Sequence, residues 1–473
     1  MPLSLDLESI AAIRAALASN VADARATFEC SFASAGSDIG FFVFAGMSPL
    51  LDLLEHIKLS QSEVAALVER ELLDEASALR LSQLRLACDI DAPAEGTPVF
   101  PGVPALVIDG PFWQVELVAS LACKVLARAT RAATRTMRYT MAVAGLEPLG
   151  TRPLLELGGE EGERGPSEAR LSRAAYLGGA TATTSSSAAL DFNVPAYVRY
   201  GSHALAAARH GELDLEAWLS AAPRGAIFCI DDAHDVLPID RVADAAAQVA
   251  SRSWSEPRFA LELASTDVIG MANAIEAAFR SRKLSTPPLF VRVPLLDELS
   301  VREMAAELPP NVGFAVDPHA GTLSVRLESE LVALEEEGRW TPRMRHGRSL
   351  QEAGEPGRKK TLRYVDAHGA PLTDISYAAN ERSPSGKELQ LFDPSTGRAA
   401  AVTGGKNAPL HHKVLRGGRR IEASTPLVEL RQRAIEQTAA LPNRYRRLHA
   451  PARYPTGISA ALLELKKREM AAR

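Results

Sequence analysis

The stretch RFALELASTDVIG, residues 258–270, joins a strand to a helix through a short polar segment. Large apolar side chains alternate with Ala260 and Glu262, which is typical of a β-strand. Ser265 and Asp267 follow at once, before a segment of helical period. In parallel α/β proteins, binding and catalytic residues gather where strands end and helices begin. The stretch therefore predicts a strand that presents polar side chains to a site.

The same pattern recurs on both sides of this stretch. Similar apolar strands are predicted at Pro153–Leu157, Pro195–Tyr200, Ala226–Asp231, Leu289–Val293 and Gly313–Val316. Ala-rich helical segments lie between them, such as Asp240–Ser251 and Asp267–Arg282. Strands that alternate with helices in this way indicate parallel βαβ units, either in a barrel or in an open sheet.

The flanking regions have a different character. Residues 1–145 mix helices with a few strands, at Ala26–Ser31, Gly40–Ala45 and Ala105–Asp109. Residues 340–425 are rich in Gly, Pro and charge, and TLRYVD and LTDISY on either side of AHGAP predict a hairpin. Two helices are expected to close the chain, near 425–440 and 459–472.

Composition limits the classes of partner. The chain of 473 residues is 46% apolar, carries a net charge of −5 and contains no apolar run long enough to cross a bilayer. This balance favours neither nucleic acid nor an anionic membrane as a partner, and the N-terminus lacks the pattern of a signal peptide, so we expect a cytoplasmic protein. Four dispersed cysteines argue against a disulfide framework or a zinc site.

The ends of the predicted strands carry an unusually polar set of residues. They are Glu156, Tyr200, Ser202, His203, Asp231, Asp232, His234, Asp235, Glu262, Ser265, Asp267, Arg292, Asp317 and His319. If these residues converge at one end of a barrel, they would form a functional site. The alternative is that they are polar only because they lie in solvent-exposed loops. The small-residue loop of YLGGATATTSSSAAL, residues 176–190, could hold a phosphate or could be an ordinary turn.

Several motifs resemble those of the nicotinate phosphoribosyltransferases, a branch of the type II phosphoribosyltransferases. RATFECSF (25–32) and GFFVFAGMSPLLDLL (40–54) resemble the family's N-terminal strand pair. GRKKTLRYVDAHG (357–369) resembles its G-R-K-x-x-x-R-x-x-D-x-x-G, and the stretch 436–466 resembles its closing L-P-x-x-x-R-x-L and Y-P-x-G-x-S motifs. The likeness covers nearly the whole chain.

This resemblance implies an irregular parallel βα barrel plus an α+β domain built from both chain ends. We expect an N-terminal α+β domain at 1–148, the barrel at 149–325, and a C-terminal segment at 326–473 that packs with the N-terminal domain. The resemblance also implies a homodimer that forms nicotinate mononucleotide from nicotinate and phosphoribosyl pyrophosphate in NAD biosynthesis. It further implies that the reaction uses Mg²⁺ and ATP, and that ATP phosphorylates an active-site histidine.

The resemblance assigns roles to individual residues. The candidate catalytic residues are His203, Asp232 and Asp267, with His203 as the reactive histidine of VPAYVRYGSHAL. The candidate substrate-binding residues are Arg131, Gly178, Gly179, Thr183, Asp235, Ser265 and Glu262. No protein metal ligand is predicted.

The chain also departs from the family pattern at charged positions. Glu160 and Glu161 replace the family's paired arginines, and the aspartate-tyrosine-glutamine motif has no counterpart in LDLESIAAIRAAL. The family's R-L-D-S-G-D becomes ELASTD, residues 262–267, which lacks the arginine and the first aspartate. Arg292 and the pair 321–322 are the candidates to substitute for lost contacts. Two alternatives therefore stand beside the enzyme, a non-catalytic dimeric homologue and a phosphoribosyltransferase for a different base.

Overall fold

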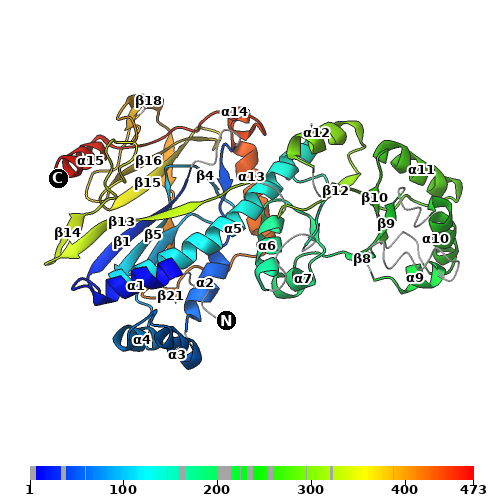
Figure 1. The fold of residues 1–473 in the computed structure, drawn as a ribbon. Helices are drawn as coiled ribbons and strands as arrows, with labels where there is room; N and C mark the ends of the chain where they lie inside the picture. Colours follow the sequence, from blue (N-terminus) through cyan, green and yellow to red (C-terminus); the bar gives the residue numbers. More distant parts are fainter. Residues whose placement is uncertain are drawn as a thin grey trace. The chain divides into compact units, whose positions relative to one another are not determined.

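The computed structural model describes residues 7–33, 39–58, 60–145, 147–158, 166–200, 215–223, 225–231, 238–253, 259–293, 296–319, 323–386 and 388–472. The chain divides into two compact units (Figure 1). The first combines Met1–Arg131 with Ser324–Arg473, and the second spans Ala132–Leu323.

The second unit is built on a parallel sheet. Its strands are β6 (Leu154–Glu156), β7 (Ala182–Thr183), β8 (Val198–Tyr200), β9 (Ala226–Asp231), β10 (Phe259–Ala264), β11 (Leu289–Arg292) and β12 (Gly313–Val316). Its helices are α6 (Pro166–Leu177), α7 (Ser186–Phe192), α9 (Leu215–Ala221), α10 (Ile239–Ser253), α11 (Val268–Ser281) and α12 (Glu298–Glu307).

The seven strands run in the order β7-β6-β12-β11-β10-β9-β8, and each neighbouring pair is parallel. A parallel bridge between Thr183 and Ala196 then joins the first strand of this order to the residues that lead into the last. The sheet thus closes on itself, which confirms the irregular parallel βα barrel.

The barrel strands end close to where the sequence predicts. Strands β9 and β12 match the predicted spans, while β8 begins three residues later than predicted, because Pro195 and Tyr197 bond to Thr183 instead. Strand β10 is buried along nearly its whole length, as a parallel strand covered on both faces should be. Helix α11 begins after Asp267, whose carboxylate caps it by accepting from Gly270 N at 2.8 Å.

The first unit is an α+β domain assembled from both ends of the chain, as expected. Its strands are β1 (Arg25–Phe32), β2 (Phe42–Val43), β3 (Asp89–Ala92), β4 (Pro98–Val99), β5 (Pro104–Pro111), β13 (Leu327–Glu336), β14 (Arg339–Pro342), β15 (Lys359–Val365), β16 (Pro371–Ala378), β17 (Glu388–Phe392), β18 (Ala399–Thr403), β19 (Lys406–Pro409), β20 (His412–Arg416), β21 (Arg419–Arg420) and β22 (Thr456–Ile458). Its helices are α1 (Leu7–Ala18), α2 (Met47–Glu55), α3 (Gln61–Glu69), α4 (Glu75–Ser82), α13 (Leu427–Ala440), α14 (Asn443–Arg446) and α15 (Ala460–Ala471), and α5 (Phe112–Ala144) begins here.

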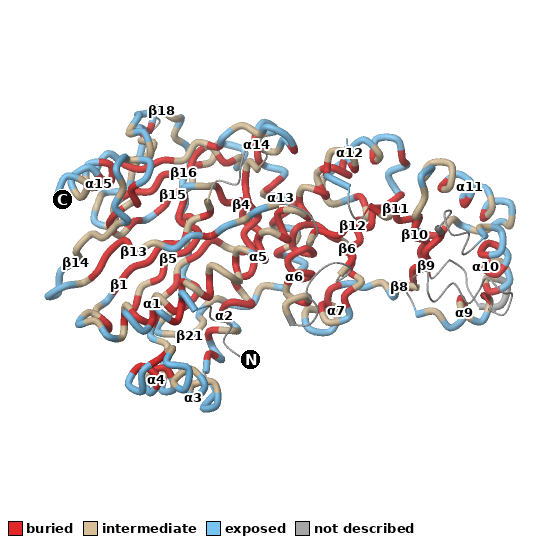
Figure 2. Tube along the Cα trace, in the orientation of Figure 1, coloured by how far each residue is buried: buried red, intermediate tan, exposed pale blue. Residues whose placement is uncertain are grey.

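Two larger sheets organise the first unit. A seven-stranded antiparallel sheet runs β14-β13-β1-β5-β3-β20-β21, and a six-stranded sheet runs β18-β17-β22-β16-β15-β19. The predicted hairpin is present as antiparallel β15 and β16. Apolar residues of β1, β5, α2 and α5 form the main core, and Figure 2 shows buried segments along these elements.

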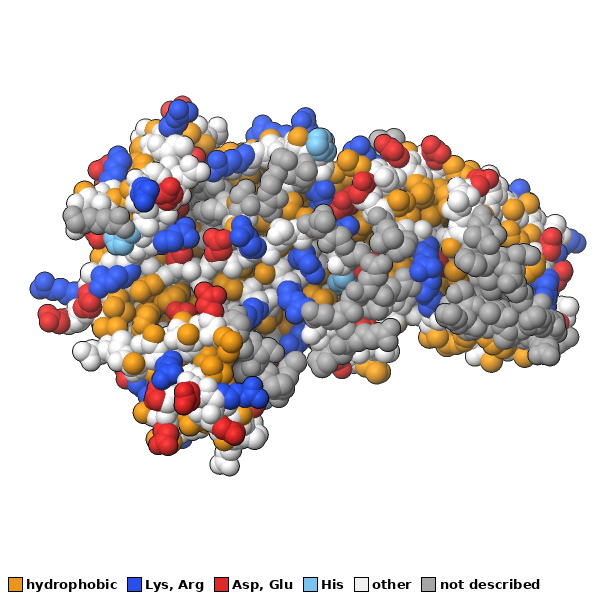
Figure 3. Space-filling model, viewed as in Figure 1, with side chains coloured by type: hydrophobic (Ala, Val, Ile, Leu, Met, Phe, Trp, Pro, Cys, Tyr) orange, Lys and Arg blue, Asp and Glu red, His pale blue; other side chains and the backbone are white. Residues whose placement is uncertain are grey.

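On the face drawn in Figure 3, charge among the described residues is not gathered in one place. Acidic and basic side chains are interspersed there. None of the helices in the described ranges combines the length and hydropathy that a membrane span requires.

Candidate functional site

The barrel interior contains an apolar layer below a polar one. Inward-facing apolar side chains from all parts of the ring form a single cluster, namely Leu155, Leu157, Ala182, Ile227, Ala260, Phe290 and Ala315, with Tyr197 packed against it. Side chains on a strand alternate between its two faces, so residues two positions further along also face inward. Arg199, Glu262, Arg292 and Asp317 occupy such positions, toward the carboxyl ends of their strands. A barrel places its chemistry at this end.

Glu262 is the centre of this polar layer. Its carboxylate is fully buried and accepts a bidentate pair of hydrogen bonds from Arg199, with Nε to Oε2 at 2.7 Å and Nη2 to Oε1 at 2.8 Å. Arg292 approaches from the other side, its Nε 3.5 Å from Glu262 Oε1. Two guanidinium groups therefore lie against the Glu262 carboxylate, and Asp317 brings a second carboxylate to the same layer.

The two arginines are the part of this layer that a ligand can reach. The side chains of Arg199 and Arg292 are 19% and 31% exposed, whereas that of Glu262 is 0% exposed. A guanidinium presents several donors in one plane and matches carboxylate and phosphate oxygens. Glu262 holds Arg199 in place, and the exposed part of the Arg292 guanidinium is the group of this layer suited to contact an anion. Arg292 thus brings positive charge to β11, the strand next to β10.

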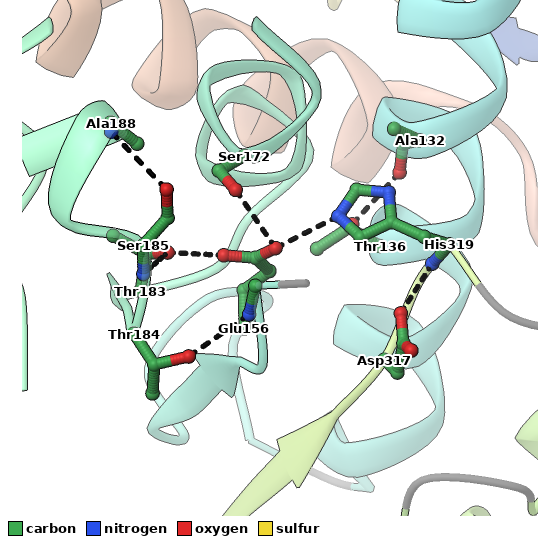
Figure 4. Close-up of polar contacts among 11 residues, drawn as sticks. Ala132, Thr136, Glu156, Ser172, Thr183, Thr184, Ser185, Ala188, Asp317 and His319 are labelled. Carbon is green, nitrogen blue, oxygen red and sulfur yellow. Dashed lines mark hydrogen bonds and ion pairs between the residues drawn. The ribbon is translucent and has the colours of Figure 1, made fainter. Parts of the chain in front are cut away.

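A second polar cluster lies on the opposite face of the barrel wall (Figure 4). Glu156 is fully buried and accepts from Ser172 Oγ of α6 at 3.0 Å and from the hydroxyl of Thr183. His319 Nε2 lies 2.8 Å from the same carboxylate, and its backbone N–H donates to Asp317 at 2.8 Å. Because Glu156 faces α6 rather than the interior, this cluster links β6, β7, α6 and the end of β12.

Ser265 and Asp267 lie at the end of β10, as predicted. The Asp267 backbone N–H donates to Ser265 Oγ at 2.9 Å, and the Asp267 carboxylate caps α11. Both side chains have a structural role in this turn. Asp267 remains exposed at the mouth, so a second role toward a ligand is compatible with its position.

The glycine pair that the sequence suggested for phosphate binding packs closely against α5. A Cβ on Gly178 would lie 2.2 Å from the carbonyl oxygen of Ala133, and one on Gly179 would lie 2.3 Å from Thr140 Oγ1. Gly179 also has a φ of +116°, in the region that glycine favours. Helix packing alone therefore accounts for both glycines.

Basic side chains recur every three or four residues along α5, at Arg128, Arg131, Arg135 and Arg138, and several of them are engaged in contacts. Arg138 pairs with Glu298 at 3.1 Å, and Arg135 donates to Tyr139 at 3.1 Å. The pKa of Arg128 is lowered by burial and by the nearby charge of Arg131. Arg131 is half-buried on this helix.

Three of the predicted site residues, His203, Asp232 and Asp235, lie outside the described residues, as do Glu160, Glu161 and the pair 321–322. Sequence reasoning overlooked Arg199, although it lies within the predicted strand Pro195–Tyr200 and directly before Tyr200, one of the polar residues noted at the strand ends. The signal that could have found it is its position two residues after the inward-facing Tyr197, together with an acid at 262 that required a partner.

Comparisons with known proteins agree with this architecture. The sequence model of the nicotinate phosphoribosyltransferase C-terminal domain matches residues 358–466. A nicotinate phosphoribosyltransferase of Mycobacterium tuberculosis is 24% identical over 442 residues, covering 92% of this chain and 86% of the relative. One from Bacillus subtilis is 23% identical over 452 residues, covering 92% and 88%.

Solved structures show the same fold. The crystal structure of human nicotinic acid phosphoribosyltransferase superposes with a TM-score of 0.80 at 21% identity, covering 99% of this chain and 100% of that one. A nicotinate-nucleotide pyrophosphorylase from Pyrococcus furiosus gives a TM-score of 0.65 at 16% identity, covering 92% and 95%.

Proposed function

This chain belongs to the nicotinate phosphoribosyltransferase family, and on that premise we propose that it transfers the phosphoribosyl group of phosphoribosyl pyrophosphate to nicotinate. The products would be nicotinate mononucleotide and pyrophosphate, which would place the protein in NAD biosynthesis. The observation that carries the proposal is the pair of guanidinium groups around Glu262 at the carboxyl end of the barrel.

Both substrates are anions, and the polar layer suits them. Phosphoribosyl pyrophosphate carries phosphate groups and nicotinate carries a carboxylate, and each matches the donors of an arginine side chain. Arg292 is the more exposed of the two arginines, so we assign it the contact with substrate. Arg199 is held by two hydrogen bonds to Glu262 and sets the positive potential behind that contact.

In the reaction, the lone pair of the nicotinate nitrogen forms a bond to C1 of the ribose. The bond from C1 to the pyrophosphate oxygen breaks, and its electrons leave with pyrophosphate. Positive charge develops on the ribose ring as this bond lengthens, and carboxylates at the mouth stabilise it. Among the described residues, Asp267 follows β10 and is exposed, and Asp317 follows β12 and is buried; Asp267 is the carboxylate that we assign to this role.

Magnesium is compatible with this site when the substrate supplies most of its ligands. The described residues contain no group of three His, Cys, Asp or Glu side chains that could hold a metal ion. Magnesium commonly binds through one or two carboxylates together with substrate phosphates. Asp267 would provide such a carboxylate, and the ion would neutralise charge on the leaving pyrophosphate.

ATP and a homodimer complete the proposal, together with a place in the cytoplasm. The family resemblance makes ATP a substrate that phosphorylates a histidine, and His203 stays the predicted residue. We propose a homodimer on the same ground.

A second candidate function is binding of an anionic ligand without turnover. Two observations favour it: Asp267 is already occupied as a helix cap, and Ala264 stands where the family carries an aspartate. Such a protein would keep the arginine layer and lack the carboxylate that stabilises the ribose.

Product formation distinguishes the two candidates. The purified chain would be incubated with nicotinate, phosphoribosyl pyrophosphate, ATP and magnesium, and nucleotides would be separated by anion-exchange chromatography. We expect nicotinate mononucleotide in amounts that exceed the enzyme present, and a reduced rate for Arg292→Gln. Binding of phosphoribosyl pyrophosphate without any product would support the second candidate and refute the first.

A further inference from the structure

The first unit contains a cavity of about 740 Å³. Its walls come from β1, from β13, from the segments 345–355 and 450–454, and from Lys466 of α15. On β1, Phe28, Cys30 and Phe32 belong to the main core. Glu29 and Ser31 alternate with these residues, so they point to the other face, and both line the cavity. A cavity of this size accommodates a small organic molecule.

Glu29 is a buried carboxylate with unused hydrogen-bonding capacity. Its side chain is 5% exposed, and its Oε2 lies 2.9 Å from Nζ of Lys359. Within the described part of the chain, Glu29 Oε1 is buried and has no hydrogen-bond partner. Burial raises the pKa of Glu29 to about 7, although the charge of Lys359 opposes this shift. A buried acceptor without a hydrogen-bond donor is unfavourable, so a ligand that donates a hydrogen bond to this oxygen would be stabilised.

Lys359 cannot satisfy that second oxygen. Its ammonium donates to the carbonyl oxygens of Glu355 at 2.7 Å and Gly357 at 3.1 Å, in addition to the contact with Glu29 Oε2. A lysine ammonium has three N–H donors, so all of its donors are in use.

The other basic side chains of the cavity are also engaged. Arg345 pairs with Glu330 at 3.1 Å, Arg453 lies 3.6 Å from Asp393, and Lys466 donates to the carbonyl oxygen of Pro394 at 3.0 Å. Among the described residues that line the cavity, the buried side-chain atom without a hydrogen-bond partner is the acceptor Glu29 Oε1. Glu330 is also the direct cross-strand neighbour of Glu29, which adds negative potential around it.

We propose that this cavity binds a small primary ammonium ligand with an apolar body, whose ammonium group donates to Glu29 Oε1. The apolar body would lie against the wall that contains Phe100 and Tyr454, whose rings stack with centroids 3.6 Å apart. The negative potential of Glu29 and Glu330 disfavours an anion of the same size. This site takes a different class of ligand from the barrel site and does not depend on the proposed reaction.

Calorimetric titration of the full chain with benzylamine at about pH 8, above the Glu29 pKa of about 7, tests the proposal, with benzyl alcohol and benzoate as neutral and anionic probes of similar shape. We expect saturable binding of benzylamine, binding at least tenfold weaker for benzyl alcohol, and none for benzoate. Glu29→Gln keeps the size of the side chain and removes its charge, so it should weaken benzylamine at least tenfold. Glu335→Gln makes the same change on β13 outside the cavity and should leave the affinity within twofold.

A second variant covers the case in which Glu29→Gln fails to fold. Ser31→Phe fills the cavity from the same strand and leaves the pair of Glu29 and Lys359 intact, and it should abolish benzylamine binding. The proposal is overturned if benzylamine does not bind, if benzoate binds as well as benzylamine, or if Ser31→Phe binds benzylamine like the unmodified chain. These readouts are independent of turnover, so a failed nicotinate assay would not affect them.

Discussion

At the scale of single residues, Glu262 combines complete burial with full hydrogen bonding. Both of its oxygens accept from Arg199, and Arg292 adds charge from the neighbouring strand. A buried ion pair is costly to form, because both charges lose their hydration. Its retention inside the barrel is consistent with a role in holding Arg199 for an anion rather than with stability alone.

We predict that Arg199→Met lowers the free energy of unfolding by about 3–5 kcal/mol, because it leaves the buried Glu262 carboxylate without its main partner. The double variant Arg199→Met with Glu262→Met removes both charges and should recover most of that loss. Urea unfolding followed by circular dichroism measures both variants. Equal stabilities of the single variant and the unmodified chain would contradict the pairing.

Glu29 gives a pH-dependent prediction. Its pKa rises from 4.5 to about 7 on folding, so the folded chain keeps a proton that the unfolded chain releases. The stability linked to this proton is present below about pH 4.5 and is lost as the pH rises through about 7. The free energy of unfolding of the unmodified chain, minus that of Glu29→Gln, should fall by about 3 kcal/mol over this range, at 1.36 kcal/mol per pKa unit. A difference that does not change with pH would contradict the assigned shift.

At the scale of secondary structure, Arg152 connects several elements of the barrel unit. Its buried guanidinium donates to the carbonyl oxygens of Ala305, Leu308 and Pro309 at the end of α12, and to that of Val312 before β12. Ala305 lies in the last turn of α12, where carbonyl groups have no partner within the helix, and the negative end of the helix dipole favours a cation there. Arg152 therefore fixes α12 next to the start of β6.

We predict that Arg152→Lys destabilises the barrel unit by about 2–4 kcal/mol. Lysine offers three donors from one atom and cannot reach the same set of carbonyl oxygens, so some of them would be left buried and unpaired. The free energy of unfolding in urea measures the change. Arg302→Lys, an exposed position on α12, is the matched control and should change stability by less than about 0.5 kcal/mol. Similar effects of the two substitutions would refute the role of Arg152.

The strands were predictable because their signal is local. Runs such as Ala226–Asp231, apolar up to its final aspartate, and Gly313–Val316 are typical of buried strands, and the structure has strands with these bounds. The closure of the barrel by the bridge between Thr183 and Ala196 could not be predicted, because a single bridge leaves no periodic pattern in the sequence. The glycine pair at 178–179 shows the opposite problem, since its local pattern suggests a phosphate loop while contacts with Ala133 and Thr140 explain it.

At the scale of the whole molecule, the family and the barrel followed from motifs spread over the chain, and the structural comparison with the human enzyme confirms the fold. The composition of the site was less predictable. In the sequence, Glu262 stands at a position where the family motif has an arginine, which suggests a reversed charge at the site. Only the folded barrel brings Arg199 from another strand to pair with Glu262. Long-range contacts of this kind have no local signature.

We predict a homodimer, as the family resemblance implies. Light scattering of the purified chain should give about twice the mass of one chain, which is 50.7 kDa. A mass of one chain at micromolar concentration would contradict this prediction and would also rule out active sites shared between subunits.

Titration of phosphoribosyl pyrophosphate into the unmodified chain and into Arg292→Gln is the most direct test of the arginine layer as the substrate site. We predict saturable binding to the unmodified chain and binding about 10- to 100-fold weaker to Arg292→Gln, because a charged hydrogen bond contributes about 1.5–3 kcal/mol. Arg302→Gln, at the exposed surface of α12, should bind like the unmodified chain. No binding to the unmodified chain, or equal binding to Arg292→Gln, would contradict the account.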